Sequence, residues 1–428
     1  MAISRSRLVP NTDVEAPEVN ASQYSGTRVV VTVEARFSRS PDGTIWTRGG
    51  PSYRFFTRYL SAFDRVRVVA RVADVPGRDD GAKRVDGAGV EVWPVPCYIG
   101  PAQYLTRRAA VVRAVRAAAE DGDAVVLRVP SPLGSLLAAS RERAGLPYAV
   151  EVVGDPYDVF APGVIRHPLR PLLRKRETAR LRHQCRTAVG AAYVTDRYLQ
   201  ARYPARTGAV TAAYSSIELP AEAYREGPRR PDPGRQGHTL VSVGTLEQMY
   251  KGVDTLVEAL ARLVATGLPL RLVHVGDGRC RPRVERIAER LGVADRVVLT
   301  GALPAGAEVR RRLDEADLFV MPSRTEGLPK ALLEAMARGL PAVGTAVGGI
   351  PELLPPDDLV PPDDPEGLAG SIRQFLTDPA RMAAASARNL GRAADFADEP
   401  LARRRDVFYH ALRDATVDAG HRAERLYR

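Results

Sequence analysis

Short runs of β-branched and aliphatic residues alternate with segments of helical periodicity along most of this chain, and this alternation constrains the fold more than any other feature. A strand that is followed by a helix and then a second strand favours a parallel sheet with helices on both faces. Strands are expected at residues 28–34, 66–72, 90–95, 124–129, 148–153, 239–243, 270–275, 297–300, 318–321 and 341–345, and helices at 51–63, 109–119, 131–144, 252–266, 281–291, 307–316, 329–338 and 366–377.

The alternation occurs twice, on either side of a proline-rich, charged stretch that has the composition of a linker. We therefore predict an α/β fold in which two Rossmann-like domains face a cleft. Ligands of such sheets bind beyond the carboxyl ends of the strands, so a site is expected in the cleft. The predicted organisation is a disordered tail at 1–26, an N-terminal domain at 27–218, a linker at 219–237, a C-terminal domain at 238–395 and further helices at 396–428.

The chain carries a formal net charge of +11, which favours anionic partners such as nucleotides, phosphorylated lipids or a membrane surface. An arginine-rich composition without a particular partner explains the same charge, and both interpretations stay open. Of the 62 cationic residues only four are lysine, namely Lys83, Lys175, Lys251 and Lys330. Against that background a lysine is a candidate for a role that needs a compact point charge.

The three cysteines are far apart and form no CxxC pair, so neither a disulfide framework nor a zinc site is expected. The first residues lack the apolar core of a signal peptide, and no run of about 18 apolar residues occurs. These features predict a cytoplasmic protein without a membrane-spanning segment.

Residues 164–186 combine eight lysines and arginines with a single acid and several leucines. Such a segment can lie on an anionic membrane surface, which would make the protein peripheral on the inner membrane face. A solvated helix face explains the same composition. Binding to nucleic acid is not expected, because no aromatic residues interleave with the basic ones.

The most informative stretch is EGLPKALLEAMARGLP at residues 326–341, which follows an apolar strand. Pro329 suits the first position of a helix, so Glu326 lies in the loop before that helix and Glu334 in its second turn. The N-terminus of a helix binds anions through its free amides, and a phosphate there would be flanked by two carboxylates. A structural interpretation competes with this one: Glu326 is an acidic residue favoured near a helix start, and Glu334 lies on a solvated helix face.

This stretch resembles the signature of retaining glycosyltransferase family four, the glycosyl transferases group 1, in which two glutamates are separated by seven residues. Five further pieces resemble that family in the correct order, at residues 243–256, 275–278, 298–301, 316–323 and 341–352. The N-terminal half resembles it more loosely, at residues 49–50, 148–155 and 192–200.

The resemblance implies a type-B fold, with the nucleotide-sugar in the C-terminal domain, the acceptor in the N-terminal domain, and the C-terminal helix at 396–428 crossing back to the N-terminal domain. It also implies that no metal or other cofactor is needed. By position in the motifs, Glu334 would bind the ribose hydroxyls, Glu326 the donor sugar and Lys251 the diphosphate. The remaining implied donor contacts are Gly244 and Thr245, Leu303 near the base, and the segment Gly327, Leu328, Pro329 and Lys330. Gly49 and Gly50 would form an acceptor or phosphate loop, whose backbone comes close to the phosphate or the sugar.

Two positions depart from the family's pattern. Thr245 stands where the family often has arginine, and we expect Arg324 or Lys330 to supply the missing phosphate cation. Val153 stands where the family often has a histidine that contacts the donor sugar, and Asp155 is expected to supply a polar contact instead. Glu326, Lys251 and Asp155 are therefore the predicted catalytic residues.

The expected function is transfer of a sugar from a nucleoside-diphosphate sugar to an acceptor, either a glycan or lipid-linked glycan or else a small secondary metabolite. A dehydrogenase is disfavoured, because no GxGxxG follows the first strand. A non-catalytic protein that binds nucleotide-sugars is the alternative of a different class.

Overall fold

The computed structural model describes residues 26–78, 80–161, 164, 167–230 and 237–426, with backbone alone described at 419–426. Most of the predicted tail, at 1–25, therefore lies outside the described residues. So do 165–166 of the basic segment, 231–236 of the predicted linker and the last two residues.

The N-terminal domain is built on a parallel sheet with the strand order β5-β3-β1-β6-β7-β8-β9. An antiparallel extension of β2 and then β4 continues from the end of β1. The strands are β1 (Arg28–Arg39), β2 (Ile45–Thr47), β3 (Arg65–Asp74), β4 (Lys83–Arg84), β5 (Val90–Pro96), β6 (Ala124–Val129), β7 (Ala149–Val152), β8 (Gly190–Tyr193) and β9 (Val210–Ala213).

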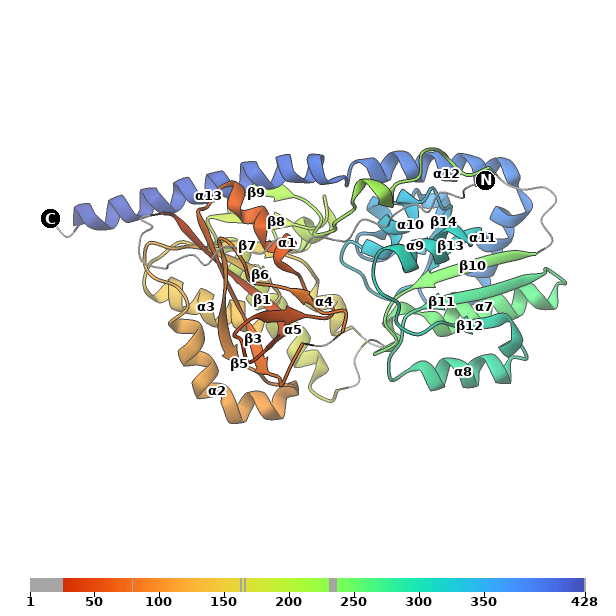
Figure 1. The fold of residues 1–428 in the computed structure, drawn as a ribbon. Coiled ribbons are helices and arrows are strands. Elements are labelled where there is room, and N and C mark those ends of the chain that lie inside the picture. The colour runs from red at the N-terminus through yellow and green to blue at the C-terminus, as the bar shows by residue number, and fades with distance from the viewer. Residues whose placement is uncertain (1–25, 79, 162–163, 165–166, 231–236, 427–428) are drawn as a thin grey trace, which may run out of the picture.

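Helices cover both faces of this sheet (Figure 1). Along β1, Val29 and Val31 pack into one apolar cluster and Val30 into another, which explains why this strand is a continuous valine run. The helices are α1 (Tyr53–Thr57), the 3-10 turn η1 (Arg58–Ser61), α2 (Gly100–Arg116), α3 (Pro132–Arg143), α4 (Pro156–Val159), α5 (Arg170–Thr187) and α6 (Tyr198–Arg202).

The C-terminal domain has a second parallel sheet, with the strand order β12-β11-β10-β13-β14-β15. The strand order reverses direction at β10, which is where such sheets bind ligands. The elements are β10 (His238–Val243), α7 (Val253–Ala265), β11 (Leu270–Val275), α8 (Arg281–Arg290), β12 (Val297–Leu299), α9 (Ala307–Asp314), β13 (Leu318–Met321), α10 (Lys330–Ala337), β14 (Ala342–Thr345), β15 (Leu359–Val360), α11 (Pro365–Thr377) and α12 (Pro379–Ala394). The 3-10 turns of this domain are η3 (Met249–Lys251), η4 (Ala294–Arg296), η5 (Ile350–Glu352) and η6 (Pro356–Asp358), and η2 (Ala221–Ala223) lies in the predicted linker.

The last helix, α13 (Asp398–Leu426), runs back along the N-terminal domain, as Figure 1 shows. Its Tyr409 is fully buried and donates a hydrogen bond of 3.1 Å to Glu151 on β7. Tyr59 and Tyr214 donate to the same Oε1 atom, and Arg128 forms an ion pair with the other oxygen. The crossing of the C-terminal helix that the resemblance implies is thus confirmed, and a buried carboxylate ties α13 to the sheet.

No helix in the described part of the chain is both long and apolar enough to cross a membrane.

Candidate functional site

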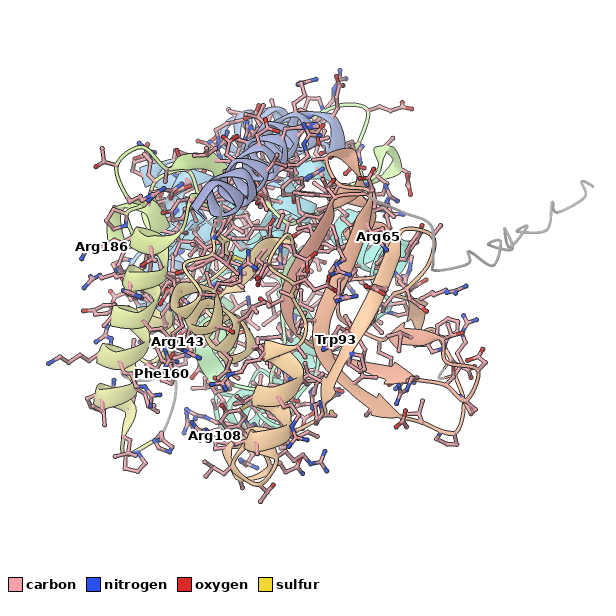
Figure 2. All side chains as sticks on the ribbon, turned by 90° about the vertical axis from the view of Figure 1, so that its left-hand side faces the viewer. Arg65, Trp93, Arg108, Arg143, Phe160 and Arg186 are labelled. Atoms are coloured by element: carbon pink, nitrogen blue, oxygen red, sulfur yellow. The ribbon has the colours of Figure 1, made fainter. Side chains whose placement is uncertain are left out.

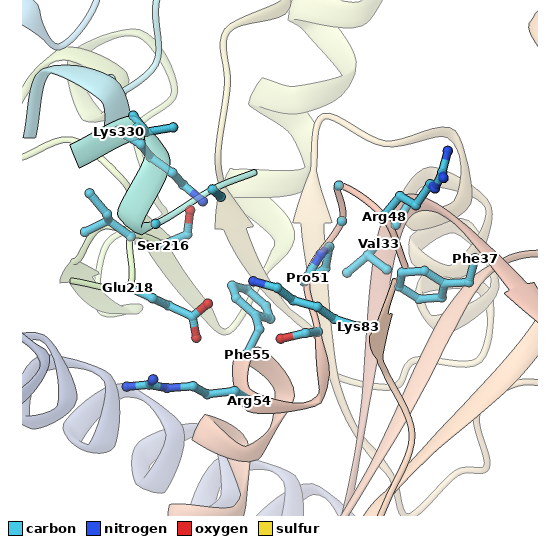
Figure 3. Close-up of a pocket in the computed structure, with 18 of the residues that line it drawn as sticks. Val33, Phe37, Arg48, Pro51, Arg54, Phe55, Lys83, Ser216, Glu218 and Lys330 are labelled. Atoms are coloured by element: carbon cyan, nitrogen blue, oxygen red, sulfur yellow. The ribbon is translucent and has the colours of Figure 1, made fainter. Parts of the chain in front are cut away.

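A cavity of about 1160 Å³ lies between the two domains. The N-terminal domain lines it with the loop that holds Gly49 and Gly50, and the C-terminal domain lines it with Lys330 and Glu334 of α10. Figure 3 shows Lys330 reaching into this space from α10, while Lys83 of β4 reaches into it from the other domain. The fold thus brings the glycine pair and the second glutamate of the motif to one cleft.

Lys251 and Glu326 form an ion pair at the carboxyl ends of β10 and β13, which are neighbours in the sheet. The Lys251 Nζ and Glu326 Oε1 atoms lie 2.6 Å apart, and the hydroxyl of Ser323 donates to the same Oε1 at 2.7 Å. The two charged side chains are only 17% and 8% exposed. The pair is not part of the lining of the cavity, which reaches α10 at Lys330 and Glu334.

Two glycines fix the backbone around this ion pair. Gly252 has φ +65°, and a Cβ atom there would lie 1.9 Å from the carbonyl oxygen of Pro322. Gly348 has φ +56°, and a Cβ atom there would lie 2.0 Å from the carbonyl oxygen of Glu326. Both the backbone conformation and the lack of space exclude a side chain at these two positions. The loops that follow β10, β13 and β14 therefore pack directly on one another next to Lys251.

The start of α10, whose Lys330 lines the cavity, has free backbone amides. Its first residues, Lys330 and Ala331, have no intrahelical acceptor for their N–H groups, and the amides of Gly327 and Leu328 have none among the described residues. Burial raises the pKa of the Glu334 carboxyl, whereas Lys330 and Arg310 act against this rise. This combination suits an anion bound at the helix start.

Comparison with known proteins agrees with this geometry. Residues 237–378 match the family model described as glycosyl transferases group 1. Protein CapJ of Staphylococcus aureus is 26% identical over 335 residues, which cover 76% of this chain and 81% of CapJ. The 2-deoxystreptamine glucosyltransferase of Streptomyces kanamyceticus is 29% identical over 280 residues, which cover 61% of this chain and 70% of that protein.

Among solved structures, sucrose-phosphate synthase from Thermosynechococcus elongatus shares the fold, with a TM-score of 0.67 and 19% identity over 91% of this chain and 100% of that chain. The family match thus covers most of the C-terminal domain, at residues 237–378. The chain is a glycosyltransferase. Its two facing domains with a returning C-terminal helix form the type-B fold that the resemblance implies.

The structure of this glycosyltransferase does not support a donor contact by Asp155. That residue is 3% exposed and caps α4, accepting from the amide of Tyr157 at 2.8 Å. Tyr203 donates to one of its oxygens and Arg202 forms an ion pair with the other. Burial raises the pKa of Asp155, and every one of these partners belongs to the N-terminal domain. We therefore assign Asp155 to holding α4 and α6 together.

Val153, two residues before Asp155, contacts the loop of Glu326 through its backbone carbonyl. A Cβ atom at Gly327 would lie 3.0 Å from the Val153 carbonyl oxygen, so the Glu326 loop packs against the end of β7.

Arg324 is likewise engaged elsewhere. Its guanidinium donates to Asp254 at 2.9 Å and to Asp363 at 2.7 Å, and it also reaches the carbonyl oxygen of Met249. Two carboxylates already neutralise this cation, so it does not supply the phosphate charge that Thr245 lacks. Of the two replacements predicted from the sequence, Lys330 is the one that the structure places at the cleft.

The loop after β10 holds the remaining predicted donor contacts. Thr245 is exposed, but its hydroxyl accepts from the amide of Glu247 at 3.1 Å and so also fixes the turn. A Cβ atom at Gly244 would lie 3.1 Å from the Lys251 side chain, which shows how closely the two residues pack. Leu303 is half-buried against the apolar core, near Ala305 and Gly306 of the cavity lining.

His274 supports this loop from below. It is 1% exposed, its Nδ1 lies 2.7 Å from Ser242 Oγ and its Nε2 lies 3.0 Å from the Gly244 carbonyl oxygen. Nε2 therefore donates to that carbonyl and the ring is neutral. Burial lowers the pKa of His274 to about 4, with the hydrogen bond to Gly244 raising it and Lys251 lowering it.

We expect this histidine to make the protein less stable in mild acid. Its pKa is about 6.5 in an unfolded chain and about 4 here, so the unfolded state binds a proton first as the pH falls. The free energy of unfolding should drop by about 3 kcal/mol between pH 6.5 and pH 4 through this residue. Urea unfolding across that range should show a shallower pH dependence for His274→Gln than for the native protein. Equal pH dependence in both would contradict the assignment.

Glu352 is the last residue of the family-like stretch 341–352, and the sequence does not reveal its role. Its carboxylate, on η5 of the C-terminal domain, accepts from the backbone amides of Asp196, Arg197 and Tyr198 at 2.5–2.9 Å. These amides form the start of α6 in the N-terminal domain. The two family-like stretches at 192–200 and 341–352 are therefore one interdomain contact, and only their shared resemblance to the family hinted at it.

No group of three or more His, Cys, Asp or Glu side chains that could hold a metal ion occurs among the described residues.

Proposed function

We propose that this glycosyltransferase is a retaining enzyme that takes a sugar from a nucleoside-diphosphate sugar bound against the C-terminal domain. The observation that carries the proposal is the grouping of the Lys251–Glu326 ion pair and the free amides of α10 at the carboxyl end of the C-terminal sheet, next to Glu334, which lines the cleft together with the glycine pair. In this arrangement Glu334 binds the ribose hydroxyls, Glu326 the sugar hydroxyls, and Lys251 with the α10 amides the diphosphate.

The proposed chemistry uses these groups for the charge that develops on the leaving group. The bond between the anomeric carbon and the diphosphate oxygen breaks, and negative charge grows on that oxygen. The acceptor hydroxyl forms its bond to the anomeric carbon from the same face, and its proton passes to the departing phosphate. Lys251 and the amides of Gly327, Leu328 and Lys330 stabilise the departing diphosphate, so this proposal requires neither a metal ion nor a protein base.

The acceptor that we favour is a glycan or lipid-linked glycan, reached from a basic face of the N-terminal domain. Figure 2 views this face, with Arg186 on α5 and Arg108 on α2. Leu105 and Leu172 are 68% and 61% exposed on the same helices. A helix pair that is basic and partly apolar suits an anionic membrane surface. Binding to anionic liposomes that resists substitution of Arg176 and Arg186 by alanine would count against this part.

A small soluble acceptor is the second candidate. The specific observation in its favour is the similarity to the 2-deoxystreptamine glucosyltransferase, which covers 61% of this chain and so extends beyond the residues that the family model matches.

Thermal unfolding with UDP, GDP, ADP and TDP tests the donor site. One nucleotide should stabilise the native protein by about 2.7 kcal/mol at 100 times its dissociation constant. Glu334→Ala should remove most of this stabilisation, because the ribose hydroxyls lose the carboxylate that is proposed to bind them. Glu289→Ala, which removes an exposed glutamate of α8 in the same domain, is the matched control and should leave it intact. If no nucleotide stabilises the native protein, the proposed function fails.

A further inference from the structure

We infer that Ser323 is a positioning residue for the transfer reaction. Its hydroxyl holds one oxygen of the Glu326 carboxylate, so that the other oxygen is presented to the hydroxyls of the donor sugar. The inference rests on the proposed function, since it assumes that Glu326 binds that sugar. Ser323 itself is not among the residues to which the family resemblance assigns a role.

The two oxygens of the Glu326 carboxylate differ in their surroundings. Oε1 accepts hydrogen bonds from the Ser323 hydroxyl at 2.7 Å and from the Lys251 ammonium at 2.6 Å. Oε2 accepts none from any residue that the structure describes, and it keeps contact with solvent. Because each oxygen of an ionised carboxylate can accept more than one hydrogen bond, Oε2 is the atom that is left for a ligand with hydroxyl groups.

The backbone that carries the Ser323 side chain is held on both sides. Ser323 is 1% exposed, and its carbonyl oxygen accepts from the hydroxyl of Thr345, the last residue of β14, at 2.5 Å. The next amide, that of Arg324, donates to the carbonyl oxygen of Tyr250 at 2.7 Å, and Tyr250 directly precedes Lys251. A hydroxyl on so firmly held a backbone can fix the orientation of a neighbouring carboxylate.

Lys251 cannot serve as the only anchor of Glu326, because the proposed mechanism also uses its charge at the diphosphate. Its ammonium has three N–H donors on a flexible stem of four carbons, so it can turn from the carboxylate to a phosphate. The Ser323 hydroxyl has one donor, and Glu326 takes it. Ser323 is therefore the contact that keeps Oε1 in place while Lys251 acts on the leaving group.

A double-mutant cycle between Ser323 and Glu326 in the full-length protein tests the inference. Calorimetry gives the dissociation constants of the free nucleotide that stabilises the protein and of its sugar conjugate, chosen among glucose, galactose, mannose and N-acetylglucosamine for the tightest binding. Ser323→Ala should weaken binding of the conjugate by about tenfold, the usual effect of losing a hydrogen bond to a charged group. The same change in a Glu326→Ala background should weaken it less than about twofold, because a positioning residue acts only through its partner.

Two further readouts separate positioning from a general structural role. The affinity of Ser323→Ala for the free nucleotide should stay within about twofold of the native value, because the nucleotide makes no proposed contact with Glu326. The rate of nucleotide release from the conjugate, with water as the acceptor, should fall at least as much as binding of the conjugate. Ser323→Cys fills nearly the same space but donates weakly, so its losses should lie between those of the native protein and Ser323→Ala.

Ser371→Ala is the matched control. It removes a buried hydroxyl on α11 of the same domain that has no hydrogen-bond partner among the described residues, and it should change neither the binding nor the rate.

Three results would overturn the inference: native affinity for the conjugate in Ser323→Ala, an equal loss of affinity for the free nucleotide, or an undiminished effect of Ser323→Ala in the Glu326→Ala background. If Ser323→Ala does not fold, Ser323→Cys carries the same comparisons. Failure of the native protein to bind any nucleotide, or native affinity for the conjugate in Glu326→Ala, would instead overturn the proposed function.

Discussion

Replacing Lys251 with methionine is expected to slow nucleotide release from the sugar donor by about 10²- to 10³-fold. Lys251 lies 2.6 Å from Glu326 at the edge where the diphosphate is proposed to leave, and removing one preorganised group that stabilises a developing oxyanion has an effect of this size. The measurement is the rate of nucleotide release from the sugar conjugate of whichever nucleotide stabilises the protein. Water serves as the acceptor in that assay.

Two controls make this result specific. Lys175→Met removes an exposed lysine of α5 and should leave the rate within a factor of two. The double variant Lys251→Met with Glu326→Gln removes both charges, so it shows whether an unpaired buried carboxylate causes the loss. If Lys251→Met alone releases nucleotide at a rate within threefold of the native one, Lys251 takes no part in the mechanism.

Replacing Glu352 with alanine is expected to lower the free energy of unfolding by about 2–3 kcal/mol and to loosen the two domains. The variant leaves three backbone amides at the start of α6 without their charged acceptor, and hydrogen bonds to charged groups contribute about 1.5–3 kcal/mol each. Chemical unfolding measures the first effect. The radius of gyration from small-angle scattering measures the second.

Glu352→Gln keeps an acceptor oxygen and should show a smaller loss. Glu285→Ala is the matched control, because it breaks an exposed ion pair with Arg281 within α8 and should cost under about 0.5 kcal/mol. Agreement between Glu352→Ala and this control in both measurements would show that the interdomain contact contributes nothing.

Most of the architecture could be predicted from local patterns. The valines at 29–31 are apolar on consecutive residues because both faces of β1 are covered, and that pattern is visible without the fold. The short strands β8 and β9 were not among the predicted ones. β8 reads Gly190-Ala-Ala-Tyr193 and becomes a strand because β7 and β9 pair with it on either side, which no local propensity shows.

Part of the donor site could likewise be predicted from the sequence, and part could not. The sequence by itself predicted the start of α10 to within one residue, since Pro329 is its N-cap rather than its first helical residue. It also determined the order of Glu326, Lys330 and Glu334, because those residues are close in the chain and a helix fixes their spacing.

Only the tertiary structure decided which of the other polar residues are available to a ligand. Asp155 and Arg324 carry suitable charges, but Arg202 neutralises the first and Asp254 and Asp363 the second. Lys83 lies in no recognisable motif, and pairing of β4 with β2 places it at the cleft. The physical reason is that a charge is free or neutralised according to its neighbours in space, and these neighbours come from 36 to 70 residues away in the chain.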